Sequence, residues 1–350
     1  MTEPPFIKGL DLSQIFYEEA VRPILGRHFP GLPHSAALIG TGSEVLGFDT
    51  PQSRDHDWGP RTMLFLSEDD HARHHEQIDQ ILSQELPAEI RGYPTKLEYH
   101  EDGLMQYRVL ILTVRGFAQS ILTFDPSGDI RVADWLSIPE YRLLMFTAGR
   151  VFHDGLEELE PLRAKLHYYP HDVWLYMLAA QWQRISQEEP FMGRCGQVKD
   201  ELGSRLVAAR LVRDLMRLCF LMEQTYTPYI KWFGTAFGRL DCANTLLPAF
   251  LRVFESRSWQ EREKHLTTAY EFVAGMHNDL GITEPLSTRV SQFYLRPFFV
   301  IKAERFVSAI RAAITSKEVR ALPEHLGAVD QFVDSTDALN EPVWSKELYK

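Results

Sequence analysis

Cysteine is scarce in this 350-residue sequence. The three cysteines, Cys195, Cys219 and Cys242, are an odd number, lie far apart and include no Cys-x-x-Cys pair. This spacing argues against both a disulfide framework and a structural zinc site. It favours a reducing compartment, so we expect a cytoplasmic protein.

Long apolar runs are also missing. The longest apolar region, residues 206–222, is interrupted by four charged residues and could cross a bilayer only at a large cost in free energy. Residues 1–10 contain Glu3 and two prolines, where a secretory signal would need a basic start and an apolar core. We expect no membrane partner.

Positive charge is in deficit. The 37 Lys and Arg residues face 48 Asp and Glu residues, which gives a formal net charge of −11. Such a chain has no overall field to hold a nucleic-acid backbone, and no basic stripe interleaved with aromatic residues stands out. Nucleic acid is therefore not an expected partner. An apolar content of 45% is nevertheless enough for a folded core.

What the sequence does contain is a change of apolar pattern near Pro139. Before it, the period switches between that of helices and that of strands. The expected helices are 12–25 and 69–82, and the expected strands are 36–39, 58–66, 90–100 and 109–114. We therefore expect an α+β chain with a mixed sheet and helices in residues 1–138.

After Pro139 the apolar spacing is that of helices. The expected helices are 172–187, 203–224, 259–277 and 286–313. Residues 152–154 are expected to close a helix, with Gly155 as its C-cap. Residues 139–350 are thus expected to form a separate all-α domain, as the length of the chain allows.

Two carboxylates stand two residues apart where the second strand is expected to begin. Residues two apart on a strand face the same side, so Asp55 and Asp57 would present both carboxylates to one place. Such a pair repels unless a cation lies between its members, and Mg²⁺ prefers oxygen ligands of this kind.

The turn after the first strand has the features of a phosphate site. Gly42 lets backbone N–H groups approach a phosphate closely, and the Ser43 hydroxyl adds a further donor. Together with the acid pair, the turn predicts a site for Mg²⁺ and a nucleoside triphosphate.

This arrangement resembles a known signature. Gly42-Ser43, Gly47, Ser53 and Asp55-x-Asp57 are similar to the motif of the nucleotidyltransferase superfamily, which includes DNA polymerase beta. Residues 172–174, 181–184 and 226–237 resemble a bacterial branch of that superfamily that carries a helical C-terminal domain of unknown function. The resemblance implies a nucleotidyltransferase fold and attack of a nucleophile on the α-phosphorus of a nucleoside triphosphate, with Asp55 and Asp57 as metal ligands.

The resemblance also implies a third carboxylate, as a metal ligand or as the base that takes the nucleophile's proton. Glu98 is the expected residue, and Glu101 or Asp102 would replace it if the strand register slips by a residue. Arg194 and Lys231 are expected to bind the triphosphate, and internal salt bridges are the alternative for both.

The expected function is transfer of a nucleoside monophosphate, AMP if ATP is the donor, to a small-molecule or protein acceptor. The alternative is a catalytically silent nucleotide-binding or interaction protein on the same fold. The sequence contains no base-reading element, so ATP is a starting assumption.

Overall fold

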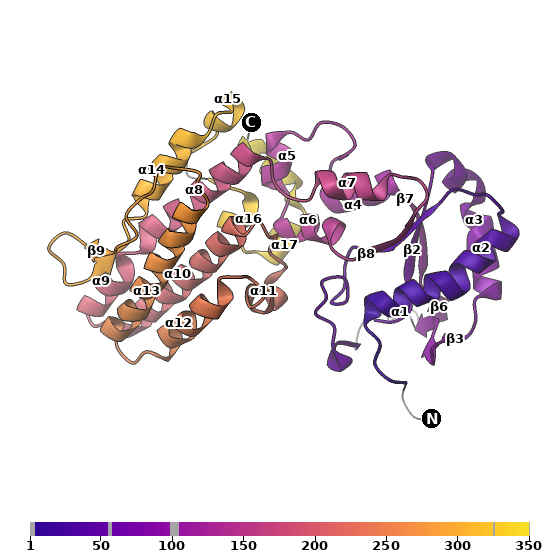
Figure 1. Cartoon of the computed structure of the whole chain (residues 1–350), viewed down its shortest axis with the longest axis horizontal. Coiled ribbons are helices and arrows are strands. Elements are labelled where there is room, and N and C mark those ends of the chain that lie inside the picture. The colour runs from indigo at the N-terminus through magenta and orange to yellow at the C-terminus, as the bar shows by residue number, and fades with distance from the viewer. Residues whose placement is uncertain (1–3, 55–57, 99–104, 325, 350) are drawn as a thin grey trace. The chain divides into compact units, whose positions relative to one another are not determined.

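The structure is a computed structural model that describes residues 4–54, 58–98, 105–324 and 326–349. Of Glu98 it describes only the backbone. The chain forms two compact units (Figure 1). Unit 1 comprises residues 1–130 and 142–167, and unit 2 comprises residues 131–141 and 168–350.

Unit 1 is built on a four-stranded mixed sheet in the order β7-β2-β1-β8. The strands are β1 (Ser35–Leu38), β2 (Thr62–Leu66), β7 (Val109–Thr113) and β8 (Arg150–Asp154). β1 runs antiparallel to both β2 and β8, whereas β2 and β7 are parallel. All residues of β1 and β2 are buried, because helices cover both faces of the two central strands. The expected α+β class with a mixed sheet is confirmed.

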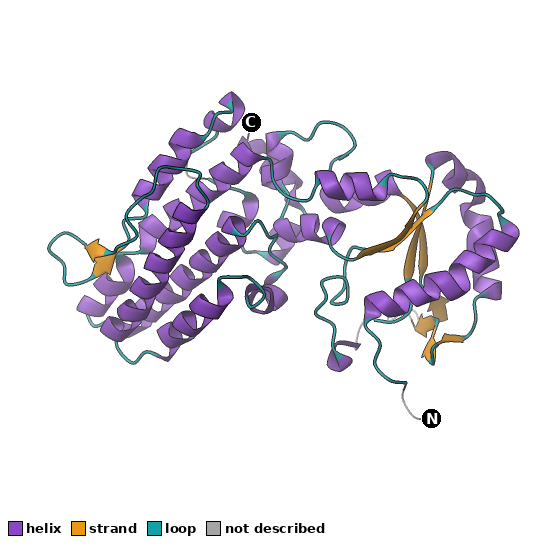
Figure 2. Ribbon diagram, in the orientation of Figure 1, coloured by secondary structure: helices purple, strands orange, loops and turns teal. Residues whose placement is uncertain are grey.

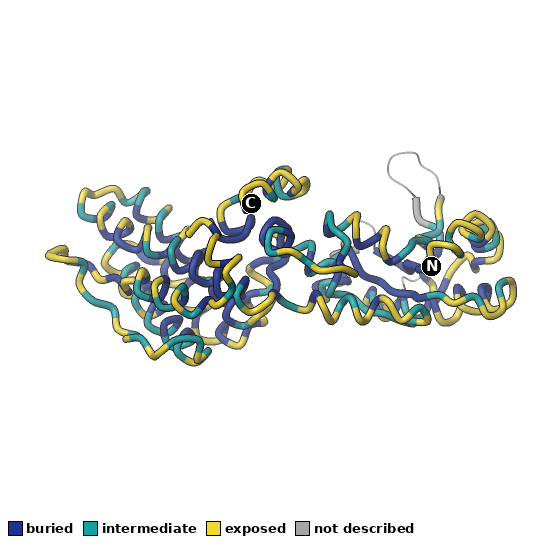
Figure 3. Tube along the Cα trace, turned by 90° about the horizontal axis from the view of Figure 1, so that it is seen from above, coloured by how far each residue is buried: buried dark blue, intermediate teal, exposed yellow. Residues whose placement is uncertain are grey.

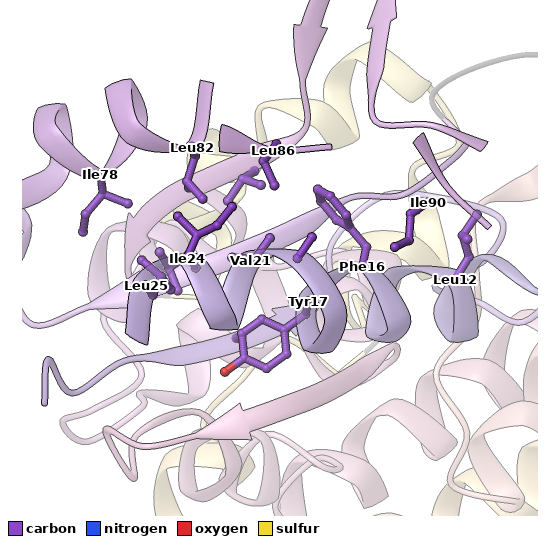
Figure 4. Close-up of a cluster of buried hydrophobic side chains, with 14 of the residues drawn as sticks. Leu12, Phe16, Tyr17, Val21, Ile24, Leu25, Ile78, Leu82, Leu86 and Ile90 are labelled. Atoms are coloured by element: carbon purple, nitrogen blue, oxygen red, sulfur yellow. The ribbon is translucent and has the colours of Figure 1, made fainter. Parts of the chain in front are cut away.

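One face of the sheet is covered by a long N-terminal helix and by α3 (Glu68–Glu85) (Figure 2). The N-terminal helix consists of α1 (Gly9–Phe16), a π-helical turn (Tyr17–Val21) and α2 (Arg22–His28). Its apolar side packs on α3 and the sheet, as Figure 4 shows for Val21 and Leu82. Tyr17 lies on the other side of the helix in Figure 4, where its hydroxyl bonds to His34 Nε2 at 2.9 Å.

The opposite face is covered by α4 (Val114–Leu122) and the later part of α6 (Glu140–Thr147). The Phe117 ring packs edge-on against Phe65 of β2, at 5.7 Å between centroids, and stacks on Phe146 at 5.8 Å. The last helix of unit 1 is α7 (Leu159–Lys165).

Four short strands between residues 89 and 107 pair two by two outside the main sheet. β3 (Glu89–Ile90) pairs with β4 (Tyr93–Pro94), and β5 (Lys96–Glu98) pairs with β6 (Met105–Tyr107). The single strand expected over residues 90–100 is therefore wrong. Arg91 and Gly92 both adopt positive φ, and this turns the chain back on itself.

Unit 2 is a helical unit whose long helices are α8 (His171–Glu188), α10 (Glu201–Met222) and α13 (Trp259–Asp279), close to the ranges expected. Residues 173–182 of α8 are buried without interruption, whereas α10 and α13 carry both buried and exposed residues. Figure 3 shows buried and exposed residues interspersed along the trace. Its other elements are α5 (Val132–Ser137), α9 (Phe191–Gln197), α11 (Ile230–Phe237), α12 (Ala243–Glu255), α14 (Glu304–Ala313), α15 (Lys317–Arg320), α16 (Val329–Phe332), α17 (Thr336–Asn340) and a 3-10 helix at Pro342–Tyr349.

Two helical expectations are wrong. Residues 286–313 are not one helix: β9 (Ser291–Gln292) and β10 (Phe299–Val300) form a hairpin before α14 begins, and Pro297 lies in its turn. Residues 152–154 do not close a helix but belong to β8, which pairs with β1. A five-residue strand at the side of a sheet is specified by a distant partner, so the local pattern does not reveal it.

The division into units differs from the single boundary expected between residues 138 and 139. The chain passes from one unit to the other after residues 130, 141 and 167. β8 returns to unit 1 to pair with β1. Residues 131–141 belong to unit 2 because the buried carboxylate of Glu140 accepts hydrogen bonds from the Thr227 N–H at 2.8 Å and the Thr227 hydroxyl at 2.6 Å.

The described helices include none with the length and apolar character needed to cross a membrane.

Candidate functional site

The turn that carries Gly42 and Ser43 lies at one end of the main sheet. At this end β1 finishes at Leu38, and the register places Leu38 beside Arg150, where β8 begins. β2 is antiparallel to β1, so β2 begins at the same end, and β7 is parallel to β2, so β7 begins there as well. We call this end the Leu38 end of the sheet. The described residues directly beside these four strand ends therefore lie in one region of unit 1.

Backbone hydrogen bonds anchor the turn at both sides. The Gly40 N–H donates to the Met145 carbonyl at 2.7 Å, and the Gly149 N–H donates to the Val45 carbonyl at 3.1 Å. Inside the turn, the Phe48 N–H donates to the Ser43 carbonyl at 2.8 Å, which closes a single helix-like turn.

Three successive N–H groups at the start of this turn, those of Thr41, Gly42 and Ser43, donate to no acceptor in the described parts of the chain. The Ser43 hydroxyl likewise has no hydrogen-bond partner among described residues. Gly42 and Ser43 are half-buried and Thr41 is exposed, so an anion from solvent can reach the three donors. Successive free N–H groups in a turn form a concave site for an anion such as phosphate.

Gly42 is required here for two reasons. Its φ of +136° is a conformation that L side chains rarely adopt. A Cβ at this position would also stand 2.3 Å from Arg61 Nη2 and 2.5 Å from Glu44 Oε2. The backbone of the turn can therefore pass close to these two side chains only as glycine.

Glu44 and Arg61 form an ion pair that the sequence interpretation missed. Arg61 Nη2 lies 2.6 Å from Glu44 Oε1 and donates to the Thr41 carbonyl at 2.5 Å. Glu44 is 3% exposed and the Arg61 side chain 16%. Burial raises the pKa of the Glu44 carboxyl, and the Arg61 guanidinium opposes this shift. Local sequence offers no signal for this pair, because its members lie 17 positions apart and meet only through the turn.

A second buried carboxylate, Asp49, ends the same loop and acts on the N-terminal helix. Its Oδ2 accepts the Gly9 N–H at 2.7 Å and the Trp58 indole N–H at 3.4 Å. The Lys8 ammonium lies 3.3 Å from Asp49 Oδ1. Asp49 therefore caps the first turn of α1, for which Lys8 supplies no side-chain cap. This structural role explains why a carboxylate is buried at that position.

Asp55 and Asp57 lie outside the described residues, so their role as metal ligands stays a prediction. Within the ranges that are described, no three His, Cys, Asp or Glu side chains gather so that they could hold a metal ion. β2 begins at Thr62, later than the Trp58 start expected from the pattern.

Glu98 lies on β5, at the position paired with Met105 of β6. The β5–β6 hairpin comes directly before β7, just as Asp55 and Asp57 come before β2. Since β2 and β7 are parallel, the segments that precede them enter the sheet at the same Leu38 end. Glu101 and Asp102 lie outside the described residues, and the roles of Glu98, Glu101 and Asp102 stay predictions.

Arg194 and Lys231 belong to unit 2, whereas Gly42 and Ser43 belong to unit 1. Arg194 is exposed on α9, where its guanidinium carbon lies 5.5 Å from the centre of the Phe191 ring. Lys231 is exposed at the start of α11, with its ammonium 5.1 Å from the centre of the Trp232 ring. Neither side chain is buried, so neither needs an internal partner, and a role in binding triphosphate stays a prediction for both.

Comparison with known proteins gives one family match and one structural similarity. Residues 135–233 match the profile of a family described as a domain of unknown function, DUF4037. A nucleotidyltransferase-like protein from Exiguobacterium sibiricum 255-15, known from a crystal structure, is 13% identical, with a TM-score of 0.33 over 75% of this chain and 77% of that one. A comparison with curated protein sequences found no match. Such low similarity transfers no residue roles, and the match to the family covers less than a third of the chain.

Proposed function

We propose that this protein is a magnesium-dependent nucleotidyltransferase that moves a nucleoside monophosphate from a nucleoside triphosphate to a small-molecule or protein acceptor. The observation that carries the proposal is the set of three N–H groups, at Thr41, Gly42 and Ser43, that find no acceptor in the described part of the chain. They lie at the Leu38 end of the sheet, on the segment that leads from β1 towards Asp55 and Asp57.

The residues fit the groups that the reaction needs. The N–H groups and the Ser43 hydroxyl are suited to phosphate oxygens, and the neighbouring Arg61 guanidinium makes the region more favourable for an anion. Asp55 and Asp57 would hold the ion, since carboxylate oxygens are ligands that Mg²⁺ prefers. Bound Mg²⁺ would neutralise negative charge on the phosphates and on the departing pyrophosphate.

The chain's own residues would bind and orient the reactants. The turn at residues 41–43 would hold the β- and γ-phosphates, which leaves the α-phosphorus open to attack. An acceptor hydroxyl oxygen would then form a bond to the α-phosphorus, and the bond from the α-phosphorus to the bridging oxygen would break. Pyrophosphate would leave with that electron pair. The hydroxyl proton would pass to the Glu98 carboxylate.

The test replaces both acids of the predicted metal pair. The double variant Asp55→Asn, Asp57→Asn should lower release of pyrophosphate from ATP and Mg²⁺, with cell extract as the source of acceptor, by roughly 100-fold or more. The matched control is Asp69→Asn, because the Asp69 side chain is 88% exposed on α3 and should not affect turnover. Transfer by the double variant at the parental rate would show the mechanism to be wrong.

A catalytically silent nucleotide-binding or interaction protein is the second candidate. It is favoured by the N–H donors of residues 41–43, which suit binding of a phosphate whether or not transfer follows. For such a protein, calorimetry would detect binding of ATP. No fraction of cell extract, added as a source of acceptor, would then cause release of pyrophosphate. Expected partners in both cases are a nucleotide and, for the enzyme, its acceptor.

A further inference from the structure

We propose that Arg61 is the cationic ligand of the triphosphate and that Glu44 is the positioning residue that holds Arg61 over the turn. This inference rests on the proposed function, because it names residues that bind the substrate of that reaction. Neither residue belongs to the motif through which the sequence resembles nucleotidyltransferases.

The first observation is the position of the guanidinium. Arg61 Nη2 bonds to the Thr41 carbonyl at 2.5 Å and lies 2.3 Å from the place where a Gly42 Cβ would stand. The guanidinium therefore lies against two residues whose N–H groups have no acceptor among the described residues, with Glu44 Oε2 2.5 Å from the same Cβ position. Backbone donors and a cation beside one another form a stronger anion site than either does alone.

The second observation is the unused hydrogen-bonding capacity of Arg61. Nη2 donates to the Thr41 carbonyl and lies within ion-pair distance of Glu44 Oε1, an atom that accepts no hydrogen bond from the described residues. Nε is buried and has no hydrogen-bond partner within the described residues. Nη1 is accessible to solvent, and it too makes no hydrogen bond to a described residue. Nη1 is thus open to an acceptor from solvent, such as a phosphate oxygen, without loss of a hydrogen bond to the described residues.

The third observation is the way in which Glu44 is held. It is 3% exposed, and only Arg61 stands within ion-pair distance of it among described side chains. Its Cβ and Cγ fill the space beside Gly9, where a side chain at residue 9 would approach within 2.6 and 2.8 Å. The first turn of α1 therefore packs against the stem of Glu44, and the carboxylate at its end lies beside Arg61. A carboxylate held at a cation in this way can orient that cation.

The substrate class follows from the charges. An arginine and three N–H donors around one turn match an inorganic or nucleoside polyphosphate, since guanidinium binds phosphate oxygens with fixed geometry. The interaction does not require a metal. It should therefore be measurable with inorganic tripolyphosphate in the presence of a chelator.

The experiment measures binding of tripolyphosphate and ATP to the full-length chain by calorimetry, with EDTA and with Mg²⁺. Arg61→Met should weaken binding of tripolyphosphate by about 10- to 100-fold, the usual range for a charge-assisted hydrogen bond. Arg61→Lys should recover part of the loss. The control Arg27→Met should bind as the parent does, because Arg27 pairs with Glu85 on the surface of α2 and α3.

Removal of Arg61 alone leaves a buried carboxylate without its partner and could prevent folding. The double variant Glu44→Gln, Arg61→Met removes both charges, and its fold can be checked by circular dichroism. Glu44→Gln alone should weaken binding less than Arg61→Met does. Because Glu44 acts through Arg61, adding Glu44→Gln to Arg61→Met should weaken binding no further. Full additivity would mean that Glu44 has only a structural role and would overturn the positioning claim.

The outcomes separate the two proposals. Tripolyphosphate binding that falls in Arg61→Met but persists in Asp55→Asn, Asp57→Asn supports the role of Arg61, whether or not nucleotide is transferred. Unchanged binding in folded Arg61 variants overturns the role of Arg61 and leaves the proposed function standing. An absence of polyphosphate binding by the parent protein, with and without Mg²⁺, overturns both.

Discussion

Replacing Gly42 by alanine tests whether the turn is as crowded as its geometry requires. The new methyl group would stand 2.3 Å from Arg61 Nη2 and 2.5 Å from Glu44 Oε2, closer than any real contact. The backbone at φ +136° would disfavour alanine even in open space. Either the turn must change conformation or the ion pair must move.

The expected magnitude combines two contributions. Holding an L residue in a sparsely populated backbone region costs about 1–3 kcal/mol. Displacing Arg61 from Glu44 would cost up to about 3–5 kcal/mol if the carboxylate stayed charged and buried. Burial already raises the pKa of Glu44, so the carboxyl can take up a proton and avoid part of that cost. We therefore expect a loss of roughly 2–5 kcal/mol in the free energy of unfolding of unit 1.

Two other glycines of unit 1 provide matched controls. Gly31 has φ +82°, but a Cβ added to it would meet no atom within 4 Å, so Gly31→Ala isolates the backbone cost of about 1–2 kcal/mol. Gly26 lies in α2 with open space around it, so Gly26→Ala should stabilise by about 0.5–1 kcal/mol.

The assay is urea unfolding, with hydrogen exchange of peptides from residues 35–66 to assign the change to unit 1. Gly42→Ala should also weaken tripolyphosphate binding, since it moves both the N–H donors and Arg61. The reasoning is refuted if Gly42→Ala destabilises no more than Gly31→Ala.

Two further predictions concern pH and chain length. Burial lowers the pKa of His277, which is 0% exposed, to about 4. The folded state therefore binds a proton at His277 less readily than the unfolded state does. As pH falls from 6.5 to about 4, this difference lowers the free energy of unfolding by about 3 kcal/mol, and above pH 6.5 it has no effect. His277→Gln should remove this part of the acid dependence in urea unfolding at pH 4–7; an unchanged difference between pH 4 and pH 7 would contradict the assignment. Burial also raises the pKa of Glu189 to about 7, which changes stability in the opposite direction, so only the difference between parent and variant reports on His277. A fragment of residues 1–138 lacks β8, which leaves one edge of β1 unpaired, and it should aggregate. A fragment of residues 1–167 contains β8 and should stay in solution. Size-exclusion chromatography compares the two fragments, and equal behaviour would mean that β8 does not protect β1.

The sequence was a good guide to elements that carry their own periodicity. The N-terminal helix, α3 and the long helices of unit 2 could be predicted because their apolar residues recur at helical spacing. β1 could be predicted because a short apolar run that ends at a glycine, here Gly40, is typical of a buried strand. β8 could not, since five residues of mixed polarity become a strand only when β1 is beside them. The hairpin at residues 291–300 was missed for the same reason.

The candidate site likewise contains some features that the local sequence predicts and others that it does not. A turn at Gly42 and Ser43 could be predicted because a glycine after a strand favours a turn, whereas their binding of phosphate stays a prediction. Glu44 and Arg61 could not, since a charged residue in a loop is usually solvated and nothing in the local pattern marks it for burial. Asp49 was missed in the same way: it caps a helix that begins forty residues earlier in the chain.

The placement of β8 has a consequence for synthesis of the protein on the ribosome. β1 emerges early, but its second neighbour follows only after about 100 further residues, roughly 5–20 seconds later at ordinary rates of translation. Throughout that interval, one side of a nascent strand that is wholly buried in the native protein has no hydrogen-bonding partner. A chaperone that shields extended apolar segments would have its longest opportunity there, and a ribosomal pause between residues 40 and 150 would lower the yield of native protein more than a later pause.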